Sequence, residues 1–196
     1  MIDFQFKEQG HIYTLGGETV PCVSELCRFL HREIYSDAPQ WSVEQAAIRG
    51  TAVHAATEAL DKAGAARIED EYLPYLMAYK AFLEDCRPSW DMIEQPLYHP
   101  EELYAGTIDR YGAVRGEPAI VELKTTYTVH KPLTRAQLNL YRKMLIARGY
   151  PVSRLYVLHL KKDGSYKLIP TDIDEPLADS LIILHKALQK RRRTKK

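Results

Sequence analysis

The sequence predicts a single α/β domain, in which strand-like segments are interspersed with helical ones. Three observations support this fold class. The chain has 196 residues, of which 45% are hydrophobic, and this is typical of one domain that buries roughly 70% of its unfolded surface. Short runs with strand-like alternation are bounded by Gly or Pro. Longer segments with helix start and stop signals lie between them. No internal repeat or long linker divides the chain, so one domain over residues 1–196 is expected.

The N-terminal part is expected to form a hairpin-like element and two helices. The segments FQF and HIYTL alternate like short strands, and residues 23–31 are typical of a short helix. A longer helix is expected over residues 42–63. Ser42 and Gln45 occupy capping-box positions at its start, and Gly64 supplies a stop.

The remaining elements alternate between helix and strand. A helix over residues 70–86 is expected to precede three strands, over 91–98, 103–114 and 118–125. The next helix runs from about Thr134 to Arg148, with Thr134 and Gln137 in capping-box positions.

The last part of the chain predicts a hairpin and a helix. RLYVLHL and SYKLIP are expected to be strands, because Asp163 and Gly164 between them suit the positive φ angles of a tight turn. A final amphipathic helix from about Glu175 leads into a basic tail that begins at about residue 186.

The charge distribution is uneven although the formal net charge is only +1. The tail KALQKRRRTKK holds many basic residues and no acid, so the body of the chain is acidic. Such a tail can attract a phosphate backbone through counterion release. It can equally be a solvated end that aids solubility, and the sequence leaves both interpretations open.

Cysteine content and hydropathy predict a cytoplasmic protein. The three cysteines, Cys22, Cys27 and Cys86, match no disulfide framework or zinc motif, and buried free thiols are expected. No apolar run approaches the ~20 residues that cross a bilayer, and the N-terminal residues lack the layout of a secretory signal. We therefore expect no membrane association.

Two acidic residues and a lysine are candidates for a metal-dependent site. In YAGTIDR, a period of two places Thr107 and Asp109 on one face of a strand, opposite Ile108. In AIVELKTT, the same alternation places Glu122 and Lys124 on a common face. A Glu-x-Lys triplet alone arises by chance in a chain of this composition. Its position at the end of an apolar strand, shortly after the strand of Asp109, is what favours a site.

Pairing of these two strands would bring the carboxylates of Asp109 and Glu122 together. Carboxylates that share a site repel each other unless a cation lies between them. Mg²⁺ and Mn²⁺ prefer oxygen ligands, and either ion can orient a phosphate and polarise an attacking water. We therefore expect Mg²⁺ or Mn²⁺ at this position, with Lys124 placing the water and offsetting negative charge.

Two further pairs of residues lie four positions apart on expected helices. His54 and Glu58 share a helical face and can both ligate a metal, although a lone helical histidine is most often packed or solvated. A histidine ligand would favour binding of Mn²⁺ over Mg²⁺. Gln137 and Tyr141 also share a face. The residues alone favour a purely structural role for Gln137, as the partner in a capping box.

Four motifs in order, RGTAVH, GTID, ELK and QLNLY, resemble the motif series of RecB-like nucleases in the PD-(D/E)XK superfamily, especially its phage-type exonuclease branch. The opening HIYTLGGETVPCVSEL also resembles the strand–turn–helix lead of phage-encoded members, although Cys22 stands where similar sequences often show Ser. The resemblance covers about residues 11–160. It implies a mixed central β-sheet flanked by helices, a restriction-endonuclease-like core with the metal site at the end of a strand pair.

The resemblance also implies roles for individual residues. It makes His54, Asp109 and Glu122 metal ligands and Lys124 the catalytic lysine. Gln137 and Tyr141 would support catalysis beside the site. The candidate substrate-binding residues are Arg49, Glu58, Thr107 and Thr125. The fork of Arg49 matches phosphate oxygens, but a merely exposed arginine fits the sequence equally well. Relatives with an iron–sulfur cluster use four cysteine ligands, so no such cluster is expected here.

The candidate metal site predicts an enzyme that acts on a phosphate group, and the resemblance implies a metal-dependent deoxyribonuclease that hydrolyses phosphodiester bonds. The resemblance implies an exonuclease on linear DNA, acting in phage-type recombination or repair. A structure-selective or nicking endonuclease on the same fold is an alternative, as is a catalytically inactive DNA-binding module. DNA is the expected binding partner. The resemblance also suggests that the chain forms a homo-oligomer and that it binds a strand-annealing recombinase.

Overall fold

A five-stranded mixed β-sheet forms the centre of the structure, a computed structural model that describes residues 3–35 and 39–193. In spatial order its strands are β4 (Ser89–Tyr98), β5 (Ala105–Val114), β6 (Glu117–Lys124), β7 (Arg154–Leu160) and β8 (Tyr166–Thr171). β6 and β7 pair in parallel, and the other neighbours pair antiparallel. The expected α/β class with a mixed central sheet is confirmed.

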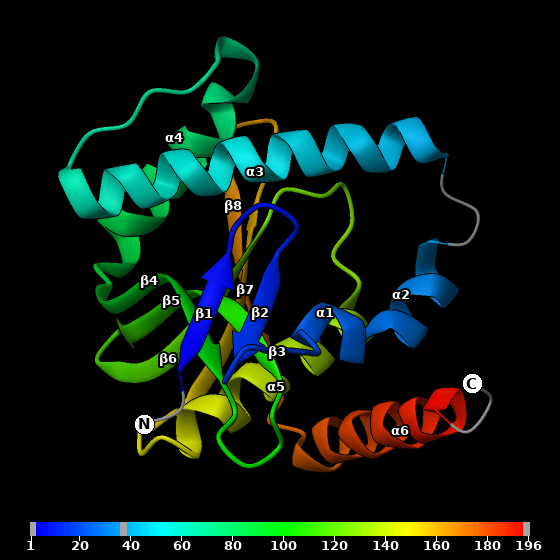
Figure 1. Cartoon of the computed structure of the whole chain (residues 1–196). Helices are drawn as coiled ribbons and strands as arrows, with labels where there is room; N and C mark the ends of the chain where they lie inside the picture. Colours follow the sequence, from blue (N-terminus) through cyan, green and yellow to red (C-terminus); the bar gives the residue numbers. More distant parts are fainter. Residues whose placement is uncertain (1–2, 36–38, 194–196) are drawn as a thin grey trace.

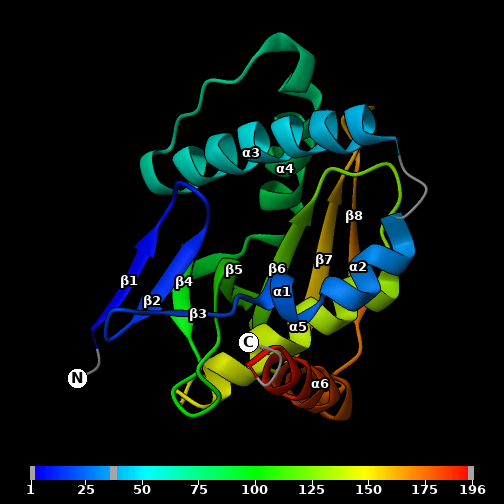
Figure 2. The same cartoon turned by 45° about the vertical axis from the view of Figure 1, so that its right-hand side comes forward.

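Helices cover both faces of this sheet, as Figures 1 and 2 show. One face carries α1 (Val23–Leu26), α5 (Lys131–Ile146) and α6 (Glu175–Arg193), and the other carries α3 (Gln40–Ala63) and α4 (Leu73–Cys86). The hydrophobic core is divided in the same way. Ile120 packs in the cluster with α5 and α6, whereas Val121 and Leu123 pack in the cluster with α3 and α4. The alternation expected for these residues of β6 is confirmed.

A second, three-stranded sheet lies beside the central one (Figure 2). It consists of β1 (Phe4–Lys7), β2 (Ile12–Leu15) and β3 (Glu18–Val20). Gly16 and Gly17 have φ angles of +58° and +84°, which few residues other than glycine adopt, and they turn the chain between β2 and β3. The Tyr13 hydroxyl lies 2.9 Å from Oγ1 of Thr107 and links this sheet to β5. The expected hairpin is therefore the first of two.

The expected capping boxes are wrong, because both helices begin earlier. α3 has Pro39 as its N-cap rather than Ser42, and α5 has His130 as its N-cap. In α5 a proline occupies the first turn, where its fixed φ favours a helix start. Thr134 consequently lies inside the helix, where its hydroxyl donates to the carbonyl of His130 at 3.2 Å. Gln137 is thereby free for another role.

Two other helices and one turn also differ from expectation. The helix expected over residues 23–31 is divided into α1 and α2 (Arg28–Tyr35). The helix expected over 70–86 begins with a short 3-10 turn, η1 (Asp70–Tyr72), before α4. In the β7–β8 turn only Gly164 has a positive φ, of +81°, while Asp163 accepts hydrogen bonds from Ser165.

The C-terminal helix extends into the basic tail. α6 continues to Arg193, so residues 186–193 are helical rather than an irregular extension, and residues 194–196 lie outside the described part. None of the helices in the described ranges is both long and apolar enough for a membrane span. Cys27 and Cys86 are buried free thiols as expected, whereas Cys22 is only partly buried.

Candidate active site

The candidate site lies where β5 and β6 part. Their pairing runs from Val114 opposite Glu117 to Arg110 opposite Val121 and goes no further along β6. Beyond this point the carboxylate of Asp109 replaces the missing partner strand, because its Oδ2 accepts the backbone N–H of Leu123 at 2.7 Å. The side chain of Asp109 is therefore fixed at the opening between the strands.

Glu122, Lys124 and Gln137 form a hydrogen-bonded group on the other side of this opening. The Lys124 ammonium donates to Oε1 of Glu122 at 2.6 Å and to Oε1 of Gln137 at 3.3 Å. Gln137, on α5, donates from Nε2 to the same Glu122 oxygen at 2.7 Å. The other oxygen of Glu122, Oε2, is buried and has no hydrogen-bond partner among the described residues. The amide thus fixes the acid and the amine relative to each other and leaves one carboxylate oxygen available.

His54 reaches the same opening from α3. Its Nδ1 lies 3.0 Å from Oε1 of Glu94 and 3.7 Å from Oδ1 of Asp109. The structure thus brings together His54, Asp109, Glu122 and Lys124, which the sequence predicts as metal-binding and catalytic residues. It adds Glu94, which the sequence analysis did not identify.

Glu94 escapes detection because its backbone departs from a regular strand. Its neighbours on β4 pair with β5, Ile93 with Arg110 and Gln95 with Ile108, so Glu94 stands opposite Asp109. Its φ is +46°, a left-handed value that is uncommon for residues other than glycine. A period-two pattern does not apply across such a distortion. Strained residues of this kind cluster at functional sites, but the strain has no signature in the sequence.

A buried arginine holds Glu94 in place. Arg110 is 0% exposed, and its Nη1 donates to Oε1 of Glu94 at 2.9 Å. Its Nε donates to Oδ2 of Asp61 at 2.7 Å, and its Nη2 donates to the hydroxyl of Thr57 at 3.1 Å. The hydroxyl of Tyr79 donates to the same Asp61 oxygen at 2.6 Å. One guanidinium therefore ties α3 and α4 to β4 and β5 around the candidate site.

The electrostatics of this group favour added positive charge. Burial alone would lower the pKa of His54, but the charges of Asp109 and Glu94 and the hydrogen bond with Glu94 raise that pKa to about 9. Burial raises the pKa of Asp109, against the charge of His54. Burial and the charge of Asp109 raise the pKa of Glu122, against the charge of Lys124. A bound divalent cation would favour the deprotonated form of each of these groups.

The donor set fits a hard divalent cation. One nitrogen of His54 and one carboxylate oxygen each of Glu94 and Asp109 all lie within 4.8 Å of one another. Glu122 lies outside this group, but its buried Oε2, which has no hydrogen-bond partner among the described residues, offers a further oxygen near Asp109. Buried or half-buried carboxylates in this region outnumber the permanent cations: the acids are Asp61, Glu94, Asp109 and Glu122, and the cations are Arg110 and Lys124. Carboxylates with an imidazole suit Mg²⁺ or Mn²⁺.

The remaining candidate residues fall into two groups. Tyr141 is buried close to the carboxylates, and Gly106 makes room for it, because a Cβ there would lie 2.7 Å from Cε1 of Tyr141. Burial and the charges of Glu122 and Asp109 hold the pKa of Tyr141 well above its usual value. Thr107 bonds to Tyr13 rather than to the acids.

The three other candidates for substrate binding are Arg49, Glu58 and Thr125. The guanidinium of Arg49 lies over the ring of Tyr75, at 5.7 Å from its centroid. Glu58 pairs with Lys62 at 2.6 Å along α3. Thr125 follows Lys124 directly and is buried. Arg49 and Glu58 are thus engaged with α3 and α4, and their predicted role in substrate binding stays a prediction.

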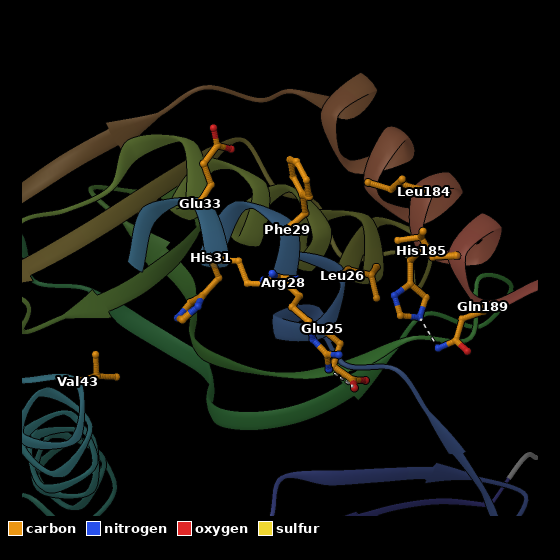
Figure 3. Close-up of a pocket in the computed structure, with 12 residues that line it drawn as sticks. Glu25, Leu26, Arg28, Phe29, His31, Glu33, Val43, Leu184, His185 and Gln189 are labelled. Atoms are coloured by element: carbon orange, nitrogen blue, oxygen red, sulfur yellow. Dashed lines mark hydrogen bonds and ion pairs between the residues drawn. The ribbon is translucent and has the colours of Figure 1, made fainter. Parts of the chain in front are cut away.

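Of two cavities beside α1 and α2, only the smaller is lined by residues of the candidate site. The smaller, of about 230 Å³, is lined by Lys124 and Gln137 together with His31. The larger, of about 910 Å³, is also lined by His31. Figure 3 shows residues of α1 and α2 facing Leu184 and His185 of α6 across the larger cavity. Because His31 contributes to both, the cavities adjoin at this side chain.

Comparisons with known proteins give only partial likenesses. No protein-family model and no curated protein matches the chain. An alkaline exonuclease (LHK-Exo) from Laribacter hongkongensis is similar in structure with a TM-score of 0.38 and 15% identity, over 72% of this chain and 84% of that one. The structure of LHK-Exo in complex with dAMP gives a TM-score of 0.44 and 14% identity, over 90% of this chain and 94% of that one. The structure of SSO0001 is similar with a TM-score of 0.33 and 16% sequence identity, over 57% of each chain. All three TM-scores lie below 0.5, so the case for a function rests on the site itself.

Replacement of Arg110 should destabilise the fold far more than loss of an exposed ion pair. Arg110→Leu leaves the buried carboxylate of Asp61 without a cationic partner and Glu94 with His54 alone, and it should cost about 3–5 kcal/mol. Arg110→Lys, which keeps the charge but not the fork, should cost less. The matched control is Arg154→Leu, which breaks the exposed pair with Glu117 and should leave the free energy of unfolding almost unchanged. Urea denaturation measures all three, and equal losses for Arg110→Leu and Arg154→Leu would contradict the role of the network.

The metal-free protein should lose stability as the pH rises through about 9. The pKa of His54 is raised from 6.5 to about 9 in the folded protein, so the stabilisation by its imidazolium is complete below pH 6.5 and is lost as the pH passes about 9. Since a tenfold change in proton affinity corresponds to about 1.4 kcal/mol, roughly 3–4 kcal/mol should disappear. Urea denaturation in EDTA at several pH values measures this loss. His54→Gln should lack it, and parallel curves for the two proteins would refute the prediction.

Proposed function

We propose that this protein is a metal-dependent nuclease that hydrolyses phosphodiester bonds of DNA. The observation that carries the proposal is the grouping of an imidazole, carboxylates and an amine at the opening between β5 and β6. Lys124 bonds to Glu122, and His54 lies within 3.7 Å of Asp109. These side chains come from separate elements, and their types match the needs of metal-assisted phosphodiester hydrolysis. The motif order RGTAVH, GTID, ELK and QLNLY supports the same reaction through its resemblance to RecB-like nucleases.

His54, Asp109 and Glu122, joined by Glu94, would hold the metal. When bound, Mg²⁺ or Mn²⁺ would supply Lewis-acid polarisation of a phosphoryl oxygen and a water of lowered pKa. The imidazole in the donor set favours Mn²⁺ in affinity. In this proposal the carboxylates also repel the phosphate, so an anionic substrate depends on compensating positive charge.

Lys124 would supply part of that charge. It lines the 230 Å³ cavity, so its ammonium can donate to a phosphate oxygen there or hold the attacking water. Gln137 accepts from Lys124 and donates to Glu122, which keeps the amine and the acid at a set separation. Tyr141, packed against Gly106, would support the carboxylates from beneath. These roles make Lys124 a catalytic residue and Gln137 and Tyr141 positioning residues.

The substrate and the mode of cleavage are the finer part of the proposal. An exonuclease that degrades linear DNA in phage-type recombination or repair follows from the family resemblance, as do a homo-oligomer and a strand-annealing recombinase partner. The basic end of α6 supports a polyanionic substrate, because lysine and arginine side chains there can exchange counterions for phosphates. An endonuclease would use the same residues, so cleavage of a closed circle distinguishes the two modes.

Lys124→Ala should abolish cleavage while leaving the fold intact. Loss of one group that stabilises developing negative charge typically costs 10²–10³-fold in rate, so a drop of about 100-fold or more is expected. The assay follows end-labelled linear duplex and closed circular DNA with Mg²⁺, with Mn²⁺ and with EDTA. The wild type should degrade linear DNA only when a metal is present.

Lys162→Ala is the matched control, because this lysine is exposed in the turn between β7 and β8 and does not line the cavity that contains Lys124. It should cleave like the wild type. Equal cleavage by Lys124→Ala and the wild type would overturn the assignment of the active site. A wild type that binds DNA but cleaves none under any metal condition would instead identify a binding module.

A further inference from the structure

A fully exposed aromatic ring stands next to the candidate active site. Tyr127 is 99% exposed, at the tip of the loop over residues 125–130, which leaves β6 directly after Lys124. The side chain of Tyr127 makes no hydrogen bond or ring contact with any residue that the structure describes. A single exposed aromatic residue is common on protein surfaces, so its meaning depends on the loop that carries it and on what lies beside it.

The loop holds Tyr127 in place from both sides. Before the tip, the carbonyl of Thr126 lies 2.7 Å from Nε2 of His159 on β7. The hydroxyl of Thr126 donates across the tip to the carbonyl of Thr128 at 2.9 Å. After the tip, Val129 packs against the hydrophobic core. The ring is therefore presented to solvent from an anchored backbone, which reduces the entropy lost when a ligand orders it.

The same loop forms a wall of the cavity that contains the catalytic lysine. Thr126 and Thr128, the two neighbours of Tyr127, line the 230 Å³ cavity together with Lys124. Three residues of extended chain span at most about 11 Å, so the backbone of Tyr127 lies within about three nucleotide steps of Lys124, at roughly 3.4 Å per step. A strand whose phosphate reaches Lys124 would pass this ring.

We propose that Tyr127 is a stacking platform for a nucleobase of the DNA strand engaged by the site, an inference that rests on the proposed nuclease function. Stacking uses the face of the ring and suits every base, so it would hold the strand without reading its sequence. It also complements the site beside it. The acidic metal ligands repel phosphates, whereas a neutral aromatic ring binds the base and avoids that repulsion.

The test measures binding of a fluorescein-labelled single-stranded DNA oligonucleotide by anisotropy, in EDTA so that no bond is cleaved. Tyr127→Ala should raise Kd about 5- to 150-fold, the range that loss of one stacked base produces. Tyr127→Phe, which keeps the ring, should bind like the wild type. Tyr150→Ala removes another exposed tyrosine, next to Tyr111 before the start of β7, and should also leave Kd unchanged.

A series of oligonucleotides with one abasic position each then identifies the partner of the ring. At one position, loss of the base should weaken binding to the wild type as much as the substitution Tyr127→Ala weakens binding of intact DNA. Binding of the Tyr127→Ala variant should be the same for intact DNA and for DNA that lacks this base. Wild-type affinity of Tyr127→Ala would overturn the proposal. So would an equal loss in Tyr127→Phe, or an effect of Tyr127→Ala that is the same with every abasic oligonucleotide.

Cleavage assays keep this inference separate from the proposed function. Base-dependent binding through Tyr127 in a wild type that cleaves no DNA would support the stacking site and end the nuclease proposal. Metal-dependent cleavage with identical DNA affinity in the wild type and Tyr127→Ala would support the nuclease proposal and end the stacking proposal.

Discussion

The pairing of the buried Arg110 guanidinium with two carboxylates is the interaction on which the candidate site depends. Asp61 and Glu94 both bond to it, and neither acid could be buried in ionised form without such a partner. Because Asp61 is on α3 and Glu94 is on β4, the ion pair also fixes the helix that carries His54 relative to the strands. The planar fork of arginine suits this task, since it can donate in several fixed directions at once.

Glu94 connects this structural network with the chemistry of the site. Its Oε1 accepts hydrogen bonds from Arg110 and contacts His54, and the residue has a φ of +46° in the middle of a strand. A conformation of this kind costs of order 1–3 kcal/mol and persists only where its surroundings impose it. The ion pair with Arg110 offsets that cost. A strained backbone and a half-buried carboxylate are together typical of a functional site.

The excess of carboxylates over cationic side chains explains why a metal cation fits at the opening between β5 and β6. Burial raises the pKa values of Asp109 and Glu122, and Oε2 of Glu122 has no hydrogen-bond partner among the described residues. A protein that gained nothing from these acids would be more stable with apolar residues in their places. Lys124 and His54 relieve part of the repulsion. A divalent cation would relieve the rest and make the pKa of each carboxylate fall again.

The sequence could predict the strands, their alternation and the residues that alternation places together. Asp109, Glu122 and Lys124 follow from regular strands, and Val121 and Leu123 face the opposite side as expected. These predictions succeed because period two is a local property of a strand. It holds along β6 whatever the rest of the chain does.

The predictions fail where long-range contacts decide the outcome. Glu94 lies at a backbone distortion that only its pairing with β5 produces, and nothing in MIEQPLY signals it. The residues alone place Gln137 in a capping box, but α5 begins earlier, so this position lies inside the helix. Only the family resemblance assigns Gln137 to the site. Arg110 was detectable in principle, because a charged residue next to Asp109 in an otherwise apolar strand requires a buried partner. Its partner Asp61 lies on a distant helix, which the sequence does not connect with it.

Electron paramagnetic resonance of bound Mn²⁺ tests most directly whether these side chains surround one cation. The wild type should bind one Mn²⁺ per chain and show a nitrogen hyperfine coupling from the imidazole of His54. His54→Gln should lose this coupling, and Lys162→Ala should retain it. Wild-type protein that binds no Mn²⁺, or that binds it with a spectrum unchanged by His54→Gln, would contradict a metal centre at this position.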